Sequence, residues 1–300
     1  MPVLIASLIF YGPFKATREM IVTTAMTTMS HQYFATFFLD DEEIQDILVR
    51  NRPIENIDDQ ELDDIKIDET ADDGIELIDV SCPTFKGKLL IIHDPSRVRL
   101  AVAPELGKVG ATTSNIVAAN NAIGGINGGG FKDDALGTGG KPEGLLMVDG
   151  NVYSGNNYTY YSAVGIDKDN KLIVSNSITL GMLQNQGVRD AVSFGPVIII
   201  NGQPTIYYGD GGYGIHPRSA IAQRKDGAIM MLAIDGRQVG SLGATMKNVQ
   251  DTLLQYGAYN AFNLDGGAST ALVYNNTVVN EPSDILGERY VPCAFIINKK

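Results

Sequence analysis

The sequence of 300 residues has no tryptophan, two cysteines and three histidines. Cys82 and Cys293 belong to no CxxC pair or Cys/His cluster, so no zinc site is indicated. His31, His93 and His216 are too dispersed for their spacing to suggest metal ligation, and we interpret each as a structural or surface residue. We therefore expect no cofactor and no metal. The two cysteines either remain as buried thiols or, in an oxidising compartment, pair across the first and last strands of the domain.

Positive charge is also scarce, with 23 Lys and Arg against 35 Asp and Glu and a net charge of −12. Proteins that bind nucleic acids rely on Lys and Arg to neutralise phosphates, so this balance argues against a nucleic-acid partner. A polyanionic substrate would need a local positive patch. The hydrophobic content of 44% and charged content of 19% describe a globular chain.

No hydrophobic run is long enough to cross a membrane. Residues 3–14, VLIASLIFYGPF, are apolar and uncharged, but a span needs roughly 20 such residues and no basic segment precedes the run. We interpret residues 1–50 as an N-terminal apolar segment and helix, the distal end of a membrane anchor. A short helix packed on the body is the alternative. We expect an extracellular or cell-surface protein attached to the membrane through its N-terminus, although Lys15 and Arg18 favour a cytoplasmic flank.

The first helical signal is followed by an acidic stretch. Asp40 with Glu43 three residues later predicts a capping box. Residues 51–74 are dominated by Asp and Glu, and such a segment buries too little apolar area to offset its ordering entropy. We interpret 51–74 as a solvated linker and expect residues 1–74 to be dispensable for activity.

From Ile75 onward the pattern changes to short apolar runs separated by turn dipeptides. Asp149-Gly150, Asn201-Gly202 and Asp226-Gly227 favour tight hairpins. Two helices are expected, one from Ser114 and one over TMKNVQDTLLQYG, with Thr245 as N-cap and Gly257 at the C-cap. The sequence thus predicts a single α+β domain over residues 75–300, rich in strands and with few helices.

Two glycine-rich turns follow apolar, strand-like runs. GGINGGGF begins at Gly124 and NLDGGAST begins at Asn263. Glycine is costly in strands and is used where the backbone takes a positive φ or is closely approached, so the two turns suggest one site. The substrate-binding candidates in these turns are Asn127, Gly128, Gly129, Asn263, Gly266, Gly267 and Ser269.

Charged residues occur at further strand ends. Arg218 lies at the entry of an apolar strand and has the fork geometry that suits phosphate or carboxylate. Asp235 and Asp265 end apolar strands, where a rigid scaffold holds side chains in place. We predict that Asp265 and Asp235 are catalytic and that Arg218 binds substrate. The alternative for Asp235 is an aspartate that shapes a hairpin turn.

These motifs together resemble the phosphodiester glycosidase family. The family includes a lysosomal enzyme that removes N-acetylglucosamine from phosphodiester-capped mannose and bacterial proteins associated with exopolysaccharide. The resemblance rests on the ordered segments GGINGGGF, PEGLLMVDG, SFGPVIIING, HPRSAIAQRKDGAIMMLAIDGRQ, YNAFNLDGGAST and PSDILGERYVP. This chain departs from the family pattern at Gly130, where an aromatic is usual, and at Ala268, where a third glycine is usual.

The resemblance implies hydrolysis of a sugar-1-phosphodiester in a cell-surface or exopolysaccharide glycan, with a phosphorylated glycan as partner. Arg218 and the loop amides would stabilise the phosphate, Asp265 or Asp235 would act as nucleophile or activate water, and Asn127 and Asn263 would hold sugar hydroxyls or loop geometry. Two alternatives stay open: a non-catalytic polysaccharide-binding or assembly module, and a phosphodiesterase that cleaves the P–O bond with a metal.

Overall fold

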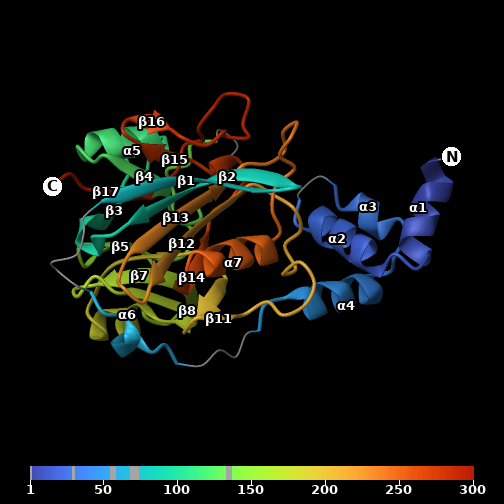
Figure 1. Cartoon of the computed structure of the whole chain (residues 1–300), viewed down its shortest axis with the longest axis horizontal. Coiled ribbons are helices and arrows are strands. Elements are labelled where there is room, and N and C mark those ends of the chain that lie inside the picture. The colour runs from blue at the N-terminus through green and yellow to red at the C-terminus, as the bar shows by residue number, and fades with distance from the viewer. Residues whose placement is uncertain (1, 29–30, 55–58, 68–73, 133–136) are drawn as a thin grey trace.

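The computed structural model describes residues 2–28, 31–54, 59–67, 74–132 and 137–300. Figure 1 shows a helical unit at the N-terminal end, built by residues 2–28 and 31–51, beside a strand-rich body. The helices are α1 (Pro2–Tyr11), α2 (Lys15–Met26), α3 (Tyr33–Thr36), α4 (Asp41–Asn51), α5 (Thr113–Ala119), α6 (Leu180–Asn185) and α7 (Met246–Gln255). The strands are β1 (Ile75–Cys82), β2 (Phe85–Ile92), β3 (Val98–Val102), β4 (Gly124–Asn127), β5 (Leu146–Val148), β6 (Asn151–Ser154), β7 (Tyr161–Asp167), β8 (Leu172–Ile178), β9 (Val188–Ser193), β10 (Val197–Ile200), β11 (Gln203–Pro204), β12 (Arg218–Arg224), β13 (Ile229–Ile234), β14 (Ala258–Leu264), β15 (Leu272–Tyr274), β16 (Thr277–Val278) and β17 (Cys293–Ile297).

The strands form three sheets. A seven-stranded sheet has the order β1-β2-β13-β12-β14-β10-β11, and two five-stranded sheets have the orders β16-β15-β4-β17-β3 and β6-β5-β9-β7-β8. Neighbouring strands pair antiparallel. The α+β, strand-rich prediction is confirmed.

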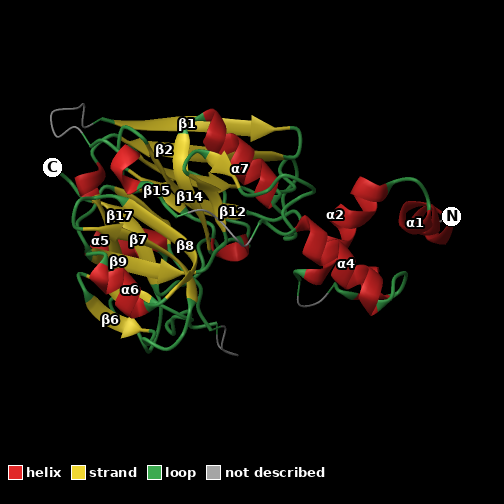
Figure 2. Ribbon diagram, turned by 90° about the horizontal axis from the view of Figure 1, so that it is seen from below, coloured by secondary structure: helices red, strands yellow, loops and turns green. Residues whose placement is uncertain are grey.

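The core lies where the inner faces of the three sheets meet. One buried cluster takes Ile221 and Phe262 from the first sheet, Ile126 and Phe295 from the second and Val192 from the third. α7 covers the opposite face of the seven-stranded sheet, as Figure 2 also shows. Because both faces of β13 are buried, this strand reads as a continuous apolar run, and the equally buried centre of β12 is the apolar stretch 220–222.

The local signals for turns and caps are confirmed. Asn201 and Gly202 take φ values of 51° and 75° in the β10–β11 hairpin, as an Asn-Gly turn predicts. Asp40 and Glu43 form the expected capping box on α4. Thr245 caps α7, and Gly257 follows its end with φ 86°.

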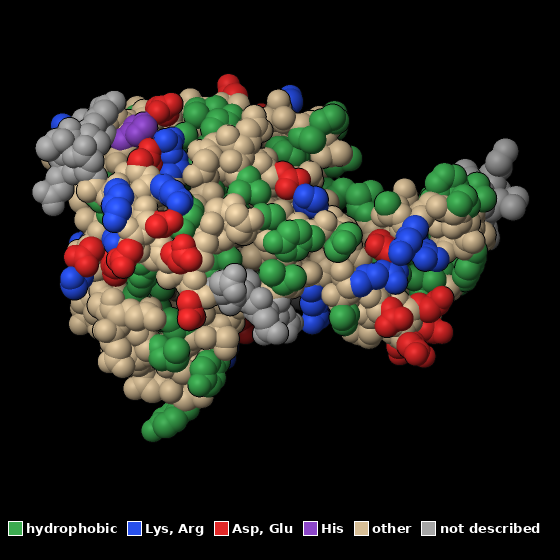
Figure 3. All heavy atoms as spheres, turned by 60° about the horizontal axis from the view of Figure 1, so that its bottom comes forward, with side chains coloured by type: hydrophobic (Ala, Val, Ile, Leu, Met, Phe, Trp, Pro, Cys, Tyr) green, Lys and Arg blue, Asp and Glu red, His purple; other side chains and the backbone are tan. Residues whose placement is uncertain are grey.

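The N-terminal helices pack around a small core of their own. Phe10 of α1 is buried and stacks on Phe38, with ring centroids 4.4 Å apart. Val22, Ile44 and Ile47 complete the contacts among α1, α2 and α4. Figure 3 shows this unit projecting from one end of the body. In the described part of the chain, no helix has both the length and the apolar character needed to cross a membrane.

The acidic stretch differs from the solvated linker that the composition suggested. Gln60 donates to Leu172 O (2.6 Å) and accepts from Val174 N (3.0 Å), and Asp64 accepts from Lys225 (2.7 Å) and Tyr259 (2.9 Å). The segment follows the edge of the body because its polar side chains satisfy backbone and cationic groups there. Residues 55–58 and 68–73 of this stretch lie outside the described residues.

The two cysteines form no disulfide. Cys293 is buried, and burial raises the pKa of its thiol to about 12. Cys82 is exposed at the end of β1, an edge strand of the seven-stranded sheet, so the expectation of two buried thiols is wrong for this residue.

Candidate active site

Most of the predicted site lies where the central strands β12, β13 and β14 of the seven-stranded sheet begin or end. β12 begins at Arg218, β13 ends just before Asp235 and β14 ends just before Asp265. Arg218 pairs with Ile234, and Ser219 with Leu264, so antiparallel pairing places these strand ends together. The first glycine turn reaches the same place from the second sheet, at the end of β4.

Asn127 joins the two glycine turns. Its side chain is fully buried and Nδ2 donates to Asp265 O at 2.6 Å. Oδ1 accepts from Ser219 Oγ (2.7 Å) and from Ala271 N (3.2 Å). All of these partners are protein groups, so Asn127 sets loop geometry.

The glycines of the first turn permit close approach. A Cβ on Gly128 would lie 2.6 Å from Cys293 Sγ, and one on Gly129 would lie 2.1 Å from Val192 Cγ2. Gly128 O also accepts from Asp265 N at 3.1 Å. Packing against β17 of the second sheet therefore requires glycine at 128, and packing against β9 of the third sheet requires it at 129. The packed turn holds the backbone of Asp265.

The second turn is half-buried from Asp265 to Ala268, whereas Ser269 is buried. Gly267 has φ 62° and its N–H donates to Pro217 O at 2.9 Å. A Cβ on Gly266 would lie 2.8 Å from the same carbonyl oxygen, so the turn fits tightly beside β12. Ala268 has no positive φ, which explains why a third glycine is not needed.

Arg218 points its guanidinium at backbone carbonyls. Nε donates to Ala244 O (3.1 Å), and Nη2 donates to Tyr213 O (2.8 Å) and Gly214 O (2.7 Å). The residue is 7% exposed, and burial lowers its pKa to about 10. These contacts hold Ala244 and the loop that precedes β12, so Nε and Nη2 are engaged by the fold, and the phosphate-binding role expected from the sequence stays a prediction.

A second arginine occupies the accessible part of the site. The guanidinium of Arg237 lies beside Gly267, with Nη2 3.4 Å from the position of a Cβ there. Nη2 also donates to His216 Nδ1 at 3.4 Å. Arg237 has φ 59°, unusual for a residue other than glycine, and burial lowers the pKa of its half-enclosed side chain.

His216 connects Arg237 to the N-terminal unit. Because an arginine can only donate, Nδ1 of His216 accepts, and Nε2 carries the proton that it donates to Thr27 Oγ1 at 2.9 Å. Burial, together with the charges of Arg218 and Arg237, lowers the histidine pKa to about 4. The imidazole is therefore neutral near pH 7.

Sequence reasoning missed both Arg237 and His216 as site residues. Their positions in the sequence were the available indication, because Arg237 lies two residues after Asp235 and His216 lies two residues before Arg218.

Asp235 is turned toward the C-terminal segment. Its Oδ1 accepts from Glu281 N (2.8 Å) and Asn280 Nδ2 (3.1 Å), and its carbonyl accepts from Ser241 Oγ (2.6 Å). Burial raises its pKa, opposed by the two donors to the carboxylate. The contacts shape the loop that carries Arg237.

Asn263 and Phe194 form the side of the site next to the third sheet. Asn263 Nδ2 donates to Gly195 O at 2.7 Å, while its buried Oδ1 has no partner among the described residues. The ring of Phe194, 42% exposed, lies 3.1 Å from the position of a Cβ on Gly130. Phe194 therefore supplies an aromatic surface beside the position where the family pattern has one. Within the described ranges, no three His, Cys, Asp or Glu residues group as metal ligands.

The family model for phosphodiester glycosidases matches residues 120–298, which include both glycine turns, Arg218, Arg237 and Asp265. The chain belongs to the phosphodiester glycosidase family. The match covers more than half of the chain and most of the body that carries the site.

Known proteins similar to this phosphodiester glycosidase include one of bacterial and one of mammalian origin. It is 28% identical over 167 residues to the SPbeta prophage-derived uncharacterized protein YomE of Bacillus subtilis, covering 53% of this chain and 25% of YomE. It is 36% identical over 70 residues to bovine N-acetylglucosamine-1-phosphodiester alpha-N-acetylglucosaminidase, covering 23% of this chain and 13% of that protein. The alignments thus span a quarter or less of these relatives.

A solved structure shows the same fold. The zebrafish N-acetylglucosamine-1-phosphodiester alpha-N-acetylglucosaminidase catalytic domain, described as auto-inhibited by its pro-peptide, aligns with a TM-score of 0.64 and 20% identity. The alignment covers 79% of this chain and 87% of the zebrafish chain.

Proposed function

We propose that this protein hydrolyses a sugar-1-phosphodiester at the glycosidic C–O bond. Water supplies the hydroxyl that ends on C1 of the sugar, and the bond between C1 and the bridging oxygen breaks. The phosphate leaves as a monoester with that oxygen, and the second proton of water is released or taken up by the monoester. Family membership and the chemistry gathered around the second glycine turn support this reaction.

Arg237 is the group we assign to the phosphate. Its guanidinium lies next to Gly267 and keeps donors available, whereas Nε and Nη2 of Arg218 are directed at backbone carbonyls. A neutral His216 holds Arg237 without adding a competing proton donor at Nδ1. Charge that develops on the leaving phosphate is stabilised best by donors that are already in place.

Asp265 is the carboxylate we assign to the chemical step, as nucleophile or as the group that activates water. Its backbone is held from both sides, by Gly128 O on its N–H and by Asn127 Nδ2 on its carbonyl. Such anchoring fixes the start of the side chain in the way that catalytic geometry requires. Asp235, whose Oδ1 already accepts two hydrogen bonds, is the second candidate.

The single observation that carries the proposal is the joining of two glycine turns from different sheets around Asp265, with Arg237 beside the second turn. A purely structural turn needs neither an exposed guanidinium nor a half-buried aspartate at the same point.

The substrate we propose is a phosphorylated glycan of the cell surface or of exopolysaccharide, and the location is extracellular or at the cell surface with membrane attachment through the N-terminal region. The names of the mammalian and zebrafish relatives make N-acetylglucosamine-1-phosphodiesters the first substrates to test. Fractionation of the producing cells, with the protein followed by an antibody, tests the location.

Hydrolysis in 18O-labelled water tests the reaction. Mass spectrometry of the products of a methyl diester of N-acetylglucosamine-1-phosphate should place the label on the sugar. Label on the phosphate would instead show P–O cleavage and a phosphodiesterase. Binding of the diester without turnover by the folded protein would favour the polysaccharide-binding module.

A further inference from the structure

A cavity of about 540 Å³ lies between α2 and the loops of the candidate site. This volume falls within the range of small-molecule sites, roughly 300–1,000 Å³. Its walls are mostly apolar, and its polar lining residues are Thr24, Thr28 and His31 on the side of the N-terminal unit and His216 and Arg237 on the side of the body. The apolar lining residues are Met20, Ile21, Ala25, Phe34, Ile215 and Leu242.

The side of this cavity that the body forms is part of the candidate active site. His216 and Arg237 both line it, and the same Arg237 guanidinium lies beside Gly267 of the second glycine turn. A molecule whose phosphate is bound by Arg237 therefore has direct access to the apolar walls.

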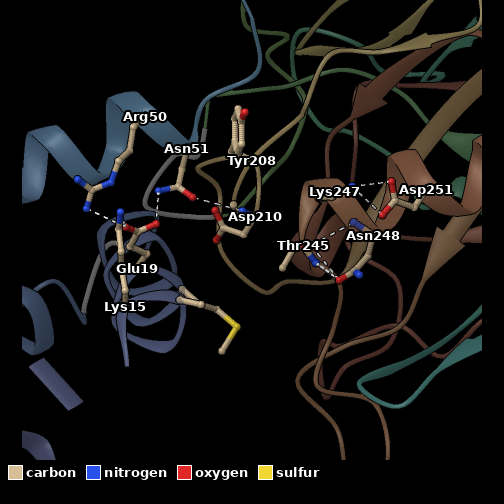
Figure 4. Close-up of a pocket in the computed structure, with 13 residues that line it drawn as sticks. Lys15, Glu19, Arg50, Asn51, Tyr208, Asp210, Thr245, Lys247, Asn248 and Asp251 are labelled. Atoms are coloured by element: carbon tan, nitrogen blue, oxygen red, sulfur yellow. Dashed lines mark hydrogen bonds and ion pairs between the residues drawn. The ribbon is translucent and has the colours of Figure 1, made fainter. Parts of the chain in front are cut away.

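α2 is a fixed wall of the cavity. Thr23 Oγ1 donates to Asp210, and Thr24 Oγ1 accepts from Ile215 N at 3.1 Å. On the other side, Asn51 of α4 accepts from Asp210 N (3.3 Å) and donates to Glu19 (3.1 Å), an arrangement shown in Figure 4. These contacts hold the helix to the loop that leads into β12, so the cavity is bounded by well-anchored elements.

The face of α2 that lines the cavity is continuous. Met20, Ile21, Thr24, Ala25 and Thr28 are spaced so that they share one side of the helix. An apolar helix face that borders a cavity instead of closing onto the body retains apolar surface for a ligand to cover.

We propose that this cavity binds the hydrocarbon part of the aglycone, so that the substrate class is a sugar-1-phosphodiester whose phosphate also carries an apolar alkyl or prenyl group. The sugar lies toward Asp265, the phosphate at Arg237 and the hydrocarbon against α2, Ile215 and Leu242. The proposal rests on the proposed hydrolysis for its reaction, while the binding of an alkyl phosphate stands independently of turnover. It also makes residues 20–28 part of substrate recognition, in contrast to the expectation that residues 1–74 are dispensable.

Two diesters of N-acetylglucosamine-1-phosphate, methyl and octyl, test the cavity in the full-length protein below the micelle concentration. Each buried methylene tightens binding about fourfold, so the KM for the octyl diester should be at least about tenfold below that for the methyl diester. Leu242→Ser removes apolar lining from an exposed side chain and should reduce this octyl-to-methyl preference at least about fivefold.

Val239→Ser is the matched control, because Val239 is a fully exposed aliphatic residue of the same loop that does not line the cavity. It should leave the preference unchanged. Equal KM values for the two diesters in the unmodified protein would overturn the proposal, as would an equal effect of the two serine variants.

Calorimetric titration with octyl phosphate and methyl phosphate separates this inference from the proposed function. Tighter binding of octyl phosphate that is weakened by Leu242→Ser supports the cavity even if no diester is hydrolysed. Hydrolysis of both diesters with no chain-length preference in rate or binding would leave the proposed function standing and refute the apolar subsite.

Discussion

The two glycine turns look alike in sequence and differ in their surroundings. In the first, Asn127, Gly128 and Gly129 are buried, and the Asn127 side chain bonds to Asp265, Ser219 and Ala271. In the second, Asp265 to Ala268 are half-buried, and Gly267 lies beside the guanidinium of Arg237. Two similar motifs can therefore have different roles, with one turn stabilising the fold and the other presenting the residues proposed for the chemical step.

The same division separates the two arginines. Arg218 is buried and donates to three backbone carbonyls, whereas Arg237 is exposed and lies beside Gly267 of the second turn. Substitutions in these turns and arginines test whether residues that stabilise the fold differ from those that bind or convert the substrate.

The largest effect is expected at the second turn. Asp265→Asn preserves size but removes the carboxylate, so kcat should fall about 10³-fold or more, corresponding to about 4 kcal/mol in the barrier, with little change in KM. Steady-state kinetics on a hydrolysed diester, with circular dichroism to verify folding, measures this. Asp226→Asn, in the exposed hairpin between β12 and β13, is the control and should keep full turnover. Near-normal kcat in folded Asp265→Asn would move the catalytic role to Asp235.

A substitution in the first turn should lower the stability of the protein. Asn127→Ala leaves the buried Ser219 hydroxyl and Ala271 N–H without their acceptor, which should lower the free energy of unfolding by about 3 kcal/mol. Urea denaturation measures the loss. If Asn127→Ala keeps its stability and instead raises KM sharply, the first turn contacts substrate and the contrast between the turns fails.

Substitution of Arg237 should weaken substrate binding, whereas substitution of Arg218 should lower stability. Arg237→Lys keeps the charge but loses the fork geometry, so KM should rise about tenfold, a loss of about 1.4 kcal/mol, without a lower Tm. Arg218→Lys should lower the free energy of unfolding by about 2 kcal/mol because one ammonium cannot serve all three carbonyls. Parallel kinetics and thermal melts distinguish the two, and a rise in KM only in Arg218→Lys would reverse the assignment.

The smallest effect concerns pH. The pKa of His216 is about 4 in the folded protein against 6.5 for the free side chain, so the unfolded chain binds the proton more readily. The stabilising contribution is complete above the unfolded pKa and is lost as pH falls from about 6.5 toward 4, by about 1 kcal/mol between pH 7 and 5.5. Urea unfolding at several pH values should show this slope, and His216→Gln should flatten it. An unchanged slope in that variant would mean that other groups cause it.

Much of the fold could be predicted because its signals are local. Asn201-Gly202 marks a turn whose φ values suit those residues, and Thr245 caps a helix whose apolar face is evident in its spacing. The family resemblance rested on ordered motifs across the body, and the match over residues 120–298 supports it.

The site was harder to derive because the direction of a side chain depends on contacts between distant segments. Arg218 has suitable chemistry for phosphate, but once the loops are folded its Nε and Nη2 donate to the carbonyl oxygens of Tyr213, Gly214 and Ala244. The role of the acidic stretch was also not readable, because the partners of Gln60 and Asp64 lie more than a hundred residues away.

The backbone of Arg237 carries a further consequence. A left-handed conformation at a residue with a Cβ costs about 1 kcal/mol, and strain of this kind tends to persist where a side chain is needed in one place. Glycine would adopt φ 59° without that cost, so Arg237→Gly is a substitution that relaxes the loop while deleting the proposed phosphate contact. Selection of variants for thermal stability alone would therefore favour a more stable protein that binds the ligand less tightly.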